Sequence, residues 1–439
     1  MIEWDKSLLS SGGAELDISD SEADSLFSQS LSQACSAIGR VSSALLIPPD
    51  ITRFHSRAGL LTAIAWRELT KAGIAVTVLP ALGTHTAVTD GERERMFPGV
   101  PAAIFRVHDW RSDVVELGRI EREWVEKATG GAVSYDWPIQ VNKLLRDGGF
   151  DLIVSLGQVV PHEVVGMANH AKNIVVGTGG KEAIDKSHFA GAAYGMEKMM
   201  GRTDTPVRAM FDEGLRRCGG KLPPVLYILT VLSARSETES RSLALRGLYC
   251  GFGRECFEQA AALSRQINVD LLDEPIRKAV VYLDPEEFRT TWLGNKAVYR
   301  TRMAMADGGE LLIIAPGLER FGEDRGIDAL IRKHGYRPAK VIREKVAADT
   351  ELVNSLSAAA HLIHGSSEGR FTIRYCPGPG LSRKEIESVG FEWGGMGEAM
   401  SRYDVGALAA GWNIGADGER FFFVPNPALG LWALRDTFN

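Results

Sequence analysis

Short hydrophobic runs alternate with longer segments of helical periodicity in the first half of the chain. In order, the runs are VSSALLIPPD, IAVTVLPALG, DLIVSLGQVV, NIVVGTGG and VLYILTVLSA. Strands that are covered on both faces carry hydrophobic residues at almost every position, as they do in parallel sheets flanked by helices. The pattern therefore predicts a parallel α/β sheet with one strand in each run.

The segment between the first two runs illustrates the predicted helices. Ser56 stands where a side chain can cap a helix, and Leu60 and Ile64 lie one turn apart on the same face. Gly73 follows the last periodic residue and can end the helix. Strand, loop and helix in succession are typical of an α/β fold.

A second group of elements follows the turn-rich segment NVDLLDEPIRK. KAVVYLDP and GELLIIAPG predict strands with a helix over NKAVYRTRMAMADGG between them, whereas YCPGPGLS and FEWGGMGE have the composition of loops. We expect an N-terminal domain over residues 1–270 and a C-terminal domain over 271–424, each with a mainly parallel sheet flanked by helices. A closing helix over 425–439 is expected to pack on the first domain, and the active site is expected in the cleft between the domains.

The composition agrees with two hydrophobic cores and argues against several classes of partner. The chain has 439 residues, of which 45% are hydrophobic, and a formal net charge of −6. Because acidic and basic residues are interleaved, no basic stripe indicates binding to nucleic acid or to an anionic membrane. The five cysteines form no C-x-x-C pair, and no stretch of about 18 apolar residues predicts a membrane span. We expect a cytoplasmic protein with small-molecule partners.

Reactive side chains stand at the ends of three predicted strands. Asp50, Thr52 and Arg53 follow ALLIPP, His85 follows the next strand, and His162 follows LIVSLGQVV. In an open α/β sheet, ligands bind beyond the carboxyl ends of the strands, so these side chains are expected to meet at one crevice. Two histidines are typical of acid–base chemistry near neutral pH, although a loop histidine can also be purely structural.

Histidines and lysines are concentrated in the segment that follows. They are His162, His170, Lys172, Lys181, Lys186 and His188. A solvated face would explain the lysines but leaves the histidines unexplained. GTGGKE lacks the first glycine and the Ser or Thr of a phosphate-binding loop, and GLYCGFGREC lacks the third glycine of a dinucleotide-binding turn. A freely exchanging nucleotide cofactor therefore has little support.

In order and spacing, these motifs together resemble those of the lactate racemase family. Its members are nickel-dependent racemases and epimerases of 2-hydroxyacids. The matching motifs are DxTR at residues 50–53, GTH at 83–85 and PH at 161–162, followed by Lys172 and His188. The resemblance covers residues 45–315 and includes the segment that carries Lys296. Each motif is weak alone, but the combination is specific.

The resemblance implies a cofactor bound by particular residues. Lys172 would hold a pyridinium-based nickel pincer nucleotide through a covalent bond, and His188 would bind its nickel ion. Asp50 and Thr52 would contribute to the cofactor site. The enzymes that synthesise this cofactor would then be partners of the protein. Imidazole suits nickel as a ligand, and a tethered hydride acceptor returns its hydride to the same substrate molecule.

For the substrate, the resemblance implies that His85 and His162 act as acid and base and that Arg53 and Lys296 bind the substrate's oxygens. Removing a hydride avoids a carbanion beside an ionised carboxylate and gives a flat 2-keto acid, which can take the hydride back on its other face. Two histidines suit this reaction because the hydroxyl groups of the two stereoisomers point to different sides. A guanidinium and an ammonium supply the cations that a carboxylate needs.

The chain departs from the family's motifs at three places. Phe54 and His55 follow DxTR where proline is common, MANHAK replaces a glycine-rich approach to the tethering lysine, and Leu293 stands where a substrate-binding glutamine is common. Lys181 and Lys186 remain alternative attachment points. These differences favour a 2-hydroxyacid other than lactate, either larger or of different polarity.

Two other hypotheses use the same residues. In the first, His85, His162 and His188 bind zinc or another divalent metal for a hydrolytic reaction. In the second, Arg53 and Lys296 bind a carboxylate without turnover. Inversion of a substrate's stereocentre would distinguish the racemase from both.

Overall fold

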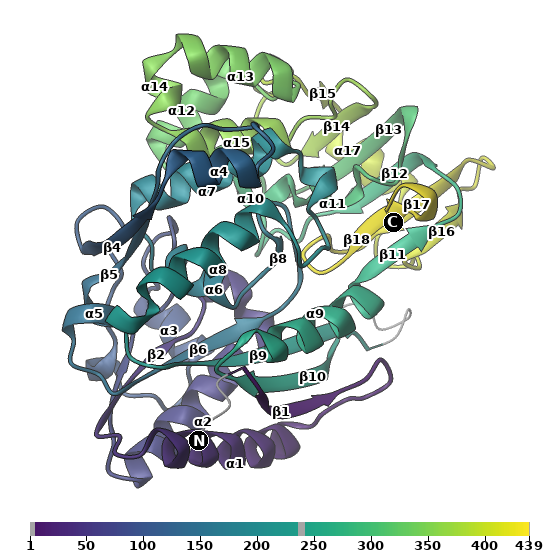
Figure 1. The fold of residues 1–439 in the computed structure, drawn as a ribbon. Helices are drawn as coiled ribbons and strands as arrows, with labels where there is room; N and C mark the ends of the chain where they lie inside the picture. Colours follow the sequence, from purple (N-terminus) through teal and green to yellow (C-terminus); the bar gives the residue numbers. More distant parts are fainter. Residues whose placement is uncertain (1–4, 236–241, 439) are drawn as a thin grey trace. The chain divides into compact units, whose positions relative to one another are not determined.

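The computed structural model describes residues 5–235 and 242–438, which divide into two compact units (Figure 1). Unit 1 consists of the described residues within 1–190, 199–233 and 243–267. Unit 2 consists of the described residues within 191–198, 234–242 and 268–439. The candidate histidines, Lys172 and the DxTR motif belong to unit 1, and Lys296 belongs to unit 2.

Unit 1 is built on a six-stranded sheet with the order β1-β10-β9-β6-β2-β3. Its strands are β1 (Ser7–Gly12), β2 (Ser43–Ile47), β3 (Ala75–Val78), β6 (Leu152–Gln158), β9 (Val225–Ala234) and β10 (Leu243–Gly251). Strands β3, β2, β6 and β9 run parallel to their neighbours in that series, and β1 is antiparallel to β10. Two small antiparallel sheets pair β4 (Val114–Ile120) with β5 (Trp137–Asn142) and β7 (Pro161–His162) with β8 (Gly166–Met167).

Helices cover both faces of this sheet (Figure 1). The helices that lie wholly or mostly in unit 1 are α1 (Asp20–Ile38), α2 (Ala58–Lys71), α3 (Asp90–Met96), α4 (Arg122–Ala128), α5 (Lys143–Asp147), α6 (Ala171–Val175), α7 (Lys181–Tyr194), α8 (Pro206–Cys218) and α9 (Arg254–Asn268). Phe27 of α1 and Leu61 of α2 share a core with Leu46 and Val154 of the sheet. The opposite face carries α9, whose Phe257 packs near the same histidine as Tyr227 of β9.

Unit 2 contains a second six-stranded sheet with the order β15-β14-β13-β12-β17-β16. Its strands are β12 (Ile276–Tyr282), β13 (Met305–Ala315), β14 (Thr372–Pro377), β15 (Glu392–Trp393), β16 (Gly411–Ile414) and β17 (Arg420–Val424). All neighbouring strands are parallel except β16 and β17. The prediction of two mainly parallel sheets flanked by helices is therefore confirmed.

The helices of unit 2 are mostly short. They are α10 (Thr291–Gly294), α11 (Lys296–Thr301), α12 (Arg325–His334), α13 (Ala339–Ala348), α14 (Thr350–Val353), α15 (Leu356–His364), α16 (Arg383–Ser388), α17 (Met396–Arg402) and α18 (Arg435–Phe438). On one face of the sheet, Ala399 and Tyr403 share a core with Val280, Ile314 and Phe423. On the other face, Tyr375 of β14 donates its hydroxyl hydrogen bond to Oδ1 of Asn295 at 2.7 Å.

Three local predictions are wrong. The run NIVVGTGG, expected to be a strand, begins within helix α6, although its β-branched residues favour strands. Instead of the closing helix expected over 425–439, residues Leu431–Leu434 form strand β18, which pairs with β11 (Val269–Leu272), and only α18 is helical there. Strands β11 and β18 both belong to unit 2, whereas the closing segment was expected to pack on the first domain. The supposed loops YCPGPGLS and FEWGGMGE contribute strands β14 and β15.

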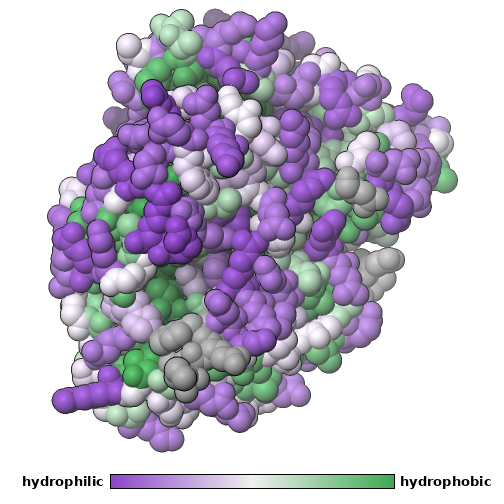
Figure 2. Space-filling model, viewed as in Figure 1, coloured by the Kyte–Doolittle hydropathy of each residue, from purple (hydrophilic) through white to green (hydrophobic). Residues whose placement is uncertain are grey.

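Hydrophilic residues make up most of the surface that is visible in Figure 2, and hydrophobic residues show there as small separate areas. This distribution agrees with hydrophobic cores that are buried within each unit. Among the residues that the model describes, no helix is both long enough and apolar enough to cross a membrane.

Candidate functional site

The predicted strand exits meet at one edge of the unit 1 sheet. Strands β3, β2 and β6 are parallel neighbours, so the segments that follow them leave on the same side. Pro49 and Ala81 continue the pairing of β2 and β3 as a parallel bridge, and Gly83 donates its main-chain hydrogen bond to the carbonyl of Gly177 at 2.9 Å. The loop that carries His85 therefore lies against the loop that follows α6.

Asp50 and His85 form a hydrogen-bonded pair. Asp50 is 4% exposed and caps the short helix at Ile51–Ser56, because its Oδ1 accepts from the main chain of Thr52 at 3.1 Å and from its hydroxyl at 2.5 Å. Its Oδ2 lies 2.5 Å from Nδ1 of His85. Burial alone would raise the pKa of Asp50, but His85, Thr52 and Arg53 lower it below its usual value. The carboxylate thus accepts the Nδ1 proton of His85 and leaves Nε2 as a base.

His162 is held in the opposite tautomer. Its Nδ1 accepts a hydrogen bond from the main chain of Val164 at 3.1 Å, so a neutral ring carries its proton on Nε2. Burial lowers the pKa of His162 well below its usual value, and the charges of Lys172 and Arg53 lower it further. Glu163, whose Oε2 lies 3.7 Å from Nδ1, acts in the opposite direction. His162 is therefore a neutral hydrogen-bond donor at Nε2.

Lys172 is the second residue of α6, beside the end of β2. The next residue, Asn173, fixes the helix there, since its Nδ2 donates to the carbonyl of Ile47 at 3.1 Å and to Oγ of Ser155 at 2.9 Å. Burial lowers the pKa of Lys172 to about 8, and the positive charge of Arg53 contributes to the decrease. Roughly a tenth of the amine is then unprotonated at pH 7 and about half near pH 8, and the unprotonated form is the one that a nucleophile requires.

His188 presents a free lone pair. Its Nδ1 donates to the carbonyl of Ile184 one turn earlier in α7, at 2.7 Å, which leaves Nε2 unprotonated in the neutral ring. Burial and, to a smaller extent, the charge of Lys172 lower the pKa of His188 to about 4. A neutral imidazole whose Nδ1 is fixed by a carbonyl is the usual form of a metal-binding histidine.

Arg53 places a guanidinium nitrogen without a hydrogen-bond partner among the described residues in the same part of unit 1. Nη1 of Arg53 is buried and makes no hydrogen bond to any residue that the model describes. Its charge lowers the pKa of both His162 and Lys172, so the three groups lie within electrostatic reach of one another. A buried donor without a partner costs free energy, and an anionic ligand would remove this cost.

Lys296 is placed in unit 2, where it begins α11. It is 8% exposed, and its Nζ lies 5.5 Å from the ring centroid of Phe288. Glu163 and Arg208 were not predicted from the sequence, although the charges of both affect the pKa of Lys172. The position of Glu163 directly after His162 at a strand exit was the available signal.

The residues of unit 1 fit the nickel pincer nucleotide better than a metal held by protein alone. Among the described residues, no group of three or more His, Cys, Asp or Glu side chains could hold a metal ion. This result disfavours a zinc site formed by His85, His162 and His188 together. A cofactor that brings its own metal ligands needs only one histidine, and His188 has Nε2 available.

Comparisons with known proteins bear on the family of the N-terminal domain and on the fold. Residues 23–200 match the family model of the lactate racemase N-terminal domain. A crystal structure of a protein from Thermotoga maritima is similar with a TM-score of 0.78 and 23% identity, covering 94% of this chain and 100% of that chain. The structure of the lactate racemase apoprotein from Thermoanaerobacterium thermosaccharolyticum has a TM-score of 0.70 and 14% identity, covering 97% of this chain and 94% of that chain.

No curated protein sequence matches the chain. At these identities the two solved structures establish a shared fold, and the family model identifies the domain that carries the candidate site. The resemblance inferred from the motifs is confirmed over residues 23–200, which match the N-terminal domain of the lactate racemase family, and the fold of the chain agrees with it.

Proposed function

We propose that this protein is an isomerase that interconverts the stereoisomers of a 2-hydroxyacid, with a nickel pincer nucleotide attached to Lys172. The family match and the fold support a racemase-type function. The finer proposal rests on one observation: an easily deprotonated Lys172 lies within electrostatic reach of Asp50 and His162, and Asp50 binds His85. A binding protein without chemistry would not need two histidines in complementary tautomers.

Each side chain of unit 1 has a task in this reaction. His85, with Nε2 unprotonated, takes the proton of the substrate's hydroxyl, and Asp50 stabilises the imidazolium that forms. When bound, the cofactor supplies a hydride acceptor, so the substrate passes through a planar 2-keto acid. His162 donates from Nε2 to the substrate's oxygen for the opposite stereoisomer. Arg53 binds the carboxylate through its free Nη1.

The reverse reaction needs the other tautomer of His162. To give up its Nε2 proton and end as a neutral ring, His162 must first take up a second proton from solvent on Nδ1, in place of the hydrogen bond that Val164 now donates. Glu163 lies 3.7 Å from that atom and can accept this proton's hydrogen bond. We therefore assign Glu163 a supporting role in the exchange of roles between the two histidines.

The remaining assignments follow from the family resemblance. His188 would bind nickel through Nε2, and Lys296 would bind a substrate oxygen. Because both oxygens of Asp50 already accept hydrogen bonds within the protein, we place its main role in orienting His85. A contact of Asp50 and Thr52 with the cofactor stays a prediction, as does the involvement of cofactor-synthesising enzymes as partners.

The decisive experiment loads the protein in cells that make the cofactor. We expect intact-mass analysis to show a covalent adduct whose site is Lys172, together with bound nickel. The loaded protein should then invert at least one member of a panel of single-enantiomer 2-hydroxyacids that includes sugar acids. Lys172→Ala should abolish both results, whereas Lys181→Ala, which alters an exposed lysine on α7, should abolish neither.

Two outcomes would overturn the proposal. One is an absence of adduct under conditions that load another family member. The other is a hydrolytic activity that Lys172→Ala retains, which would revive the divalent-metal hypothesis. Binding of a 2-hydroxyacid without inversion or exchange of the hydrogen at its stereocentre would favour a carboxylate-binding protein.

A further inference from the structure

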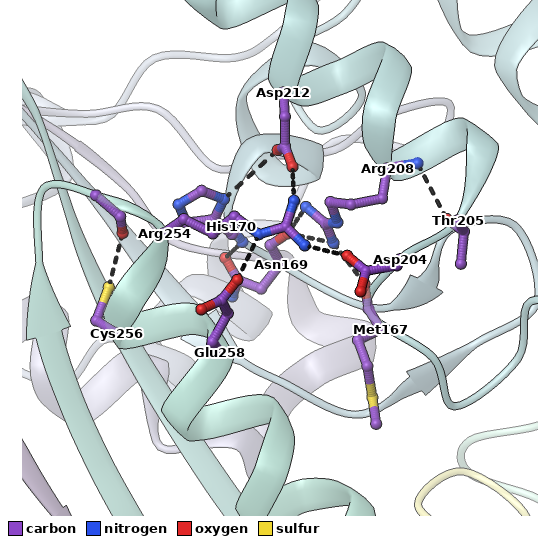
Figure 3. Close-up of polar contacts among 11 residues, drawn as sticks. Met167, Asn169, His170, Asp204, Thr205, Arg208, Asp212, Arg254, Cys256 and Glu258 are labelled. Carbon is purple, nitrogen blue, oxygen red and sulfur yellow. Dashed lines mark hydrogen bonds and ion pairs between the residues drawn. The ribbon is translucent and has the colours of Figure 1, made fainter. Parts of the chain in front are cut away.

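A buried arginine lies behind the helix that carries Lys172. Arg208 of α8 is fully buried, and its Nη2 donates to the carbonyl of Met167 at 2.6 Å. Nη1 and Nη2 both donate to the carbonyl of Asn169 at 3.2 Å (Figure 3). The guanidinium therefore binds two main-chain carbonyls within three residues of one another, shortly before α6 begins.

The backbone at this point has a conformation that it would not adopt by itself. Asn169 has a φ of 68° and His170 has a φ of 57°. The left-handed region is unfavourable for residues other than glycine, although asparagine tolerates it better than most. The side chain of Asn169 helps locally, because its Oδ1 accepts from the main chain of His170 at 2.7 Å. Two consecutive non-glycine residues with positive φ, the second of which has a ψ of −132° and so lies outside the left-handed helical region, need support from the surrounding structure.

The aromatic neighbours hold the same turn from the other side. The ring of His170 lies 4.1 Å from the ring of Tyr227 and 5.2 Å from that of Phe257, measured between centroids. Cζ of Arg208 lies 4.3 Å from the centroid of the same Phe257. The imidazole and the guanidinium thus share one aromatic surface.

Acidic and basic side chains lie near the guanidinium of Arg208. Oδ1 of Asp212, one turn along α8, lies 4.0 Å from Nδ1 of His170. Arg254 holds Asp212 through Nη1 at 2.7 Å, and it also contacts Asp204 at 2.6 Å and Glu258 at 2.8 Å (Figure 3). Burial lowers the pKa of Arg208 to about 10, and the negative charge of Asp212 offsets part of this decrease without a direct salt bridge.

Lys172 is fixed between this cluster and a second anchor. The turn at Asn169 and His170 precedes it, and Asn173, bound to Ile47 and Ser155, follows it. Helix α6 has only five residues, and so short a helix has little stability of its own. The direction of the Lys172 side chain therefore depends on what holds the two ends of α6.

We propose that Arg208 is a positioning residue for Lys172: by binding the carbonyls of Met167 and Asn169, it holds the left-handed turn that aims the lysine into the site. This inference rests on the proposed function, in which Lys172 is the attachment point of the cofactor. The positive charge of Arg208 acts in the same sense, since it is one of the charges that lower the pKa of Lys172.

The test measures the order of the turn directly. In Arg208→Lys, which keeps the charge but loses the planar fork, we expect amide hydrogen exchange in a peptide spanning residues 168–177 to become about tenfold faster. Arg246→Lys is the matched control, because Arg246 is also buried in unit 1 and donates to the carbonyl of Leu16 at 2.7 Å and to Ser233 at 3.0 Å. It should leave exchange in residues 168–177 at the wild-type rate.

A second variant separates positioning from packing. Glycine adopts a φ of 68° without strain, so adding Asn169→Gly to Arg208→Lys should restore part of the lost protection, although it also removes the hydrogen bond from His170 to Oδ1 of Asn169. If Arg208→Lys does not fold, recovery of the fold in the double variant supports the proposal. Wild-type exchange at 168–177 in a folded Arg208→Lys overturns it, and so does a double variant with no recovery.

Covalent loading gives the functional readout. In cells that make the cofactor, Arg208→Lys should carry at least fivefold less adduct on Lys172 than the wild type or Arg246→Lys, and the double variant should regain part of it. An unchanged adduct yield in Arg208→Lys contradicts the positioning role. If the wild type itself carries no adduct, the proposed function fails, while the exchange measurement still decides the role of Arg208 in the turn.

Discussion

Three histidines of unit 1 differ in what their Nδ1 atom contacts, and this difference determines their chemistry. Nδ1 faces a carboxylate in His85, a main-chain N–H in His162 and a main-chain carbonyl in His188. We predict that ¹⁵N NMR at neutral pH finds the proton on Nδ1 in His85 and His188 and on Nε2 in His162. The same tautomer in His85 and His162 would contradict the division of labour proposed for them.

The pair of Asp50 and His85 allows a mutational test. In Asp50→Asn the amide can donate to Nδ1 and favour the wrong tautomer, so turnover of the loaded enzyme should fall roughly 10²–10⁴-fold, the usual contribution of a positioned acid or base. Kinetics with the inverted substrate would measure this loss. Because both residues act through one base, Asp50→Asn combined with His85→Gln should lose little more than His85→Gln alone. Additive losses would show that Asp50 acts independently of His85.

The amine of Lys172 should react at lower pH than an ordinary lysine. Its pKa is lowered to about 8, so the unprotonated amine predominates above that pH. Labelling of the cofactor-free protein with an amine-reactive probe, followed by peptide mass spectrometry, should give a half-maximal rate near pH 8 at Lys172. A free lysine-containing peptide, with a pKa of about 10.4, serves as the reference. A profile that coincides with the reference would contradict the burial and the charge assigned to this site.

At the scale of elements, the hydrophobic pattern predicted the central strands because each is buried on both faces. Strand β6 is buried along its whole length and β2 from Ala44 to Ile47, so their sequences carry the continuous hydrophobic signal of a parallel strand. The motifs at the strand exits were predictable for the same reason, since strand order decides where exits meet. The prediction for the segment at α6 was wrong. Its β-branched residues indicated a strand, but the hydrogen bonds of Asn173 and the turn at His170 impose a helix there.

Arg208 shows why part of the site could not be predicted. In the sequence it stands in an amphipathic helix, where an arginine normally faces water. Val207, Met210, Phe211 and Gly214 form the buried face of α8, and Arg208 lies one turn before Phe211 on that face. This position was a signal that the side chain of Arg208 points inward. The carbonyl of Asn169 that it binds, however, lies 39 residues earlier in the chain, and no local sequence pattern reveals a contact over that distance.

Strand β6 ends near a glycine that the turn at Asn169 requires. Gly157 has a φ of 148°, and an added Cβ would lie 2.4 Å from Nδ2 of Asn169. We predict that Gly157→Ala destabilises the protein by about 1–3 kcal/mol, from backbone strain and from the clash. Thermal unfolding followed by circular dichroism would measure this. The control is Gly91→Ala in α3, where an added Cβ meets nothing within 4 Å and stability should be unchanged or slightly higher. Equal stabilities would contradict the close approach.

At the scale of the whole molecule, the buried histidines make stability depend on pH. Burial lowers the pKa of His170 from 6.5 to about 3 and that of His188 from 6.5 to about 4, and it lowers the pKa of His162 as well. All three belong to unit 1. In the unfolded chain a histidine has a pKa of about 6.5. Between pH 6.5 and 4 the unfolded chain therefore binds protons that the folded protein does not.

The sign of this effect is fixed by proton linkage. A group whose pKa is lower in the folded state leaves stability unaffected above its unfolded pKa and reduces it as pH falls below that value, by up to about 1.4 kcal/mol per pH unit for each histidine. Burial raises the pKa of Asp212, so this one carboxyl group takes up its proton earlier in the folded protein and has the opposite effect on stability. Carboxylates whose pKa is lowered in the folded state reduce the stability of the folded protein mainly below pH 4. The loss of stability between pH 6.5 and 4 is therefore attributed to the buried histidines.

We predict that the melting temperature of the cofactor-free protein is nearly constant from pH 8 to 7 and falls steeply from pH 6.5 to 4.5. Circular dichroism at a series of pH values would measure it. His170→Asn removes one titrating group at a position where asparagine tolerates the positive φ, so its melting temperature should fall less steeply over the same window, even if it starts lower at pH 7. Parallel curves for the wild type and His170→Asn would mean that His170 takes up its proton in the folded state. The imidazole would then not be confined between Tyr227 and Phe257, and the aromatic support assigned to the turn before Lys172 would be absent.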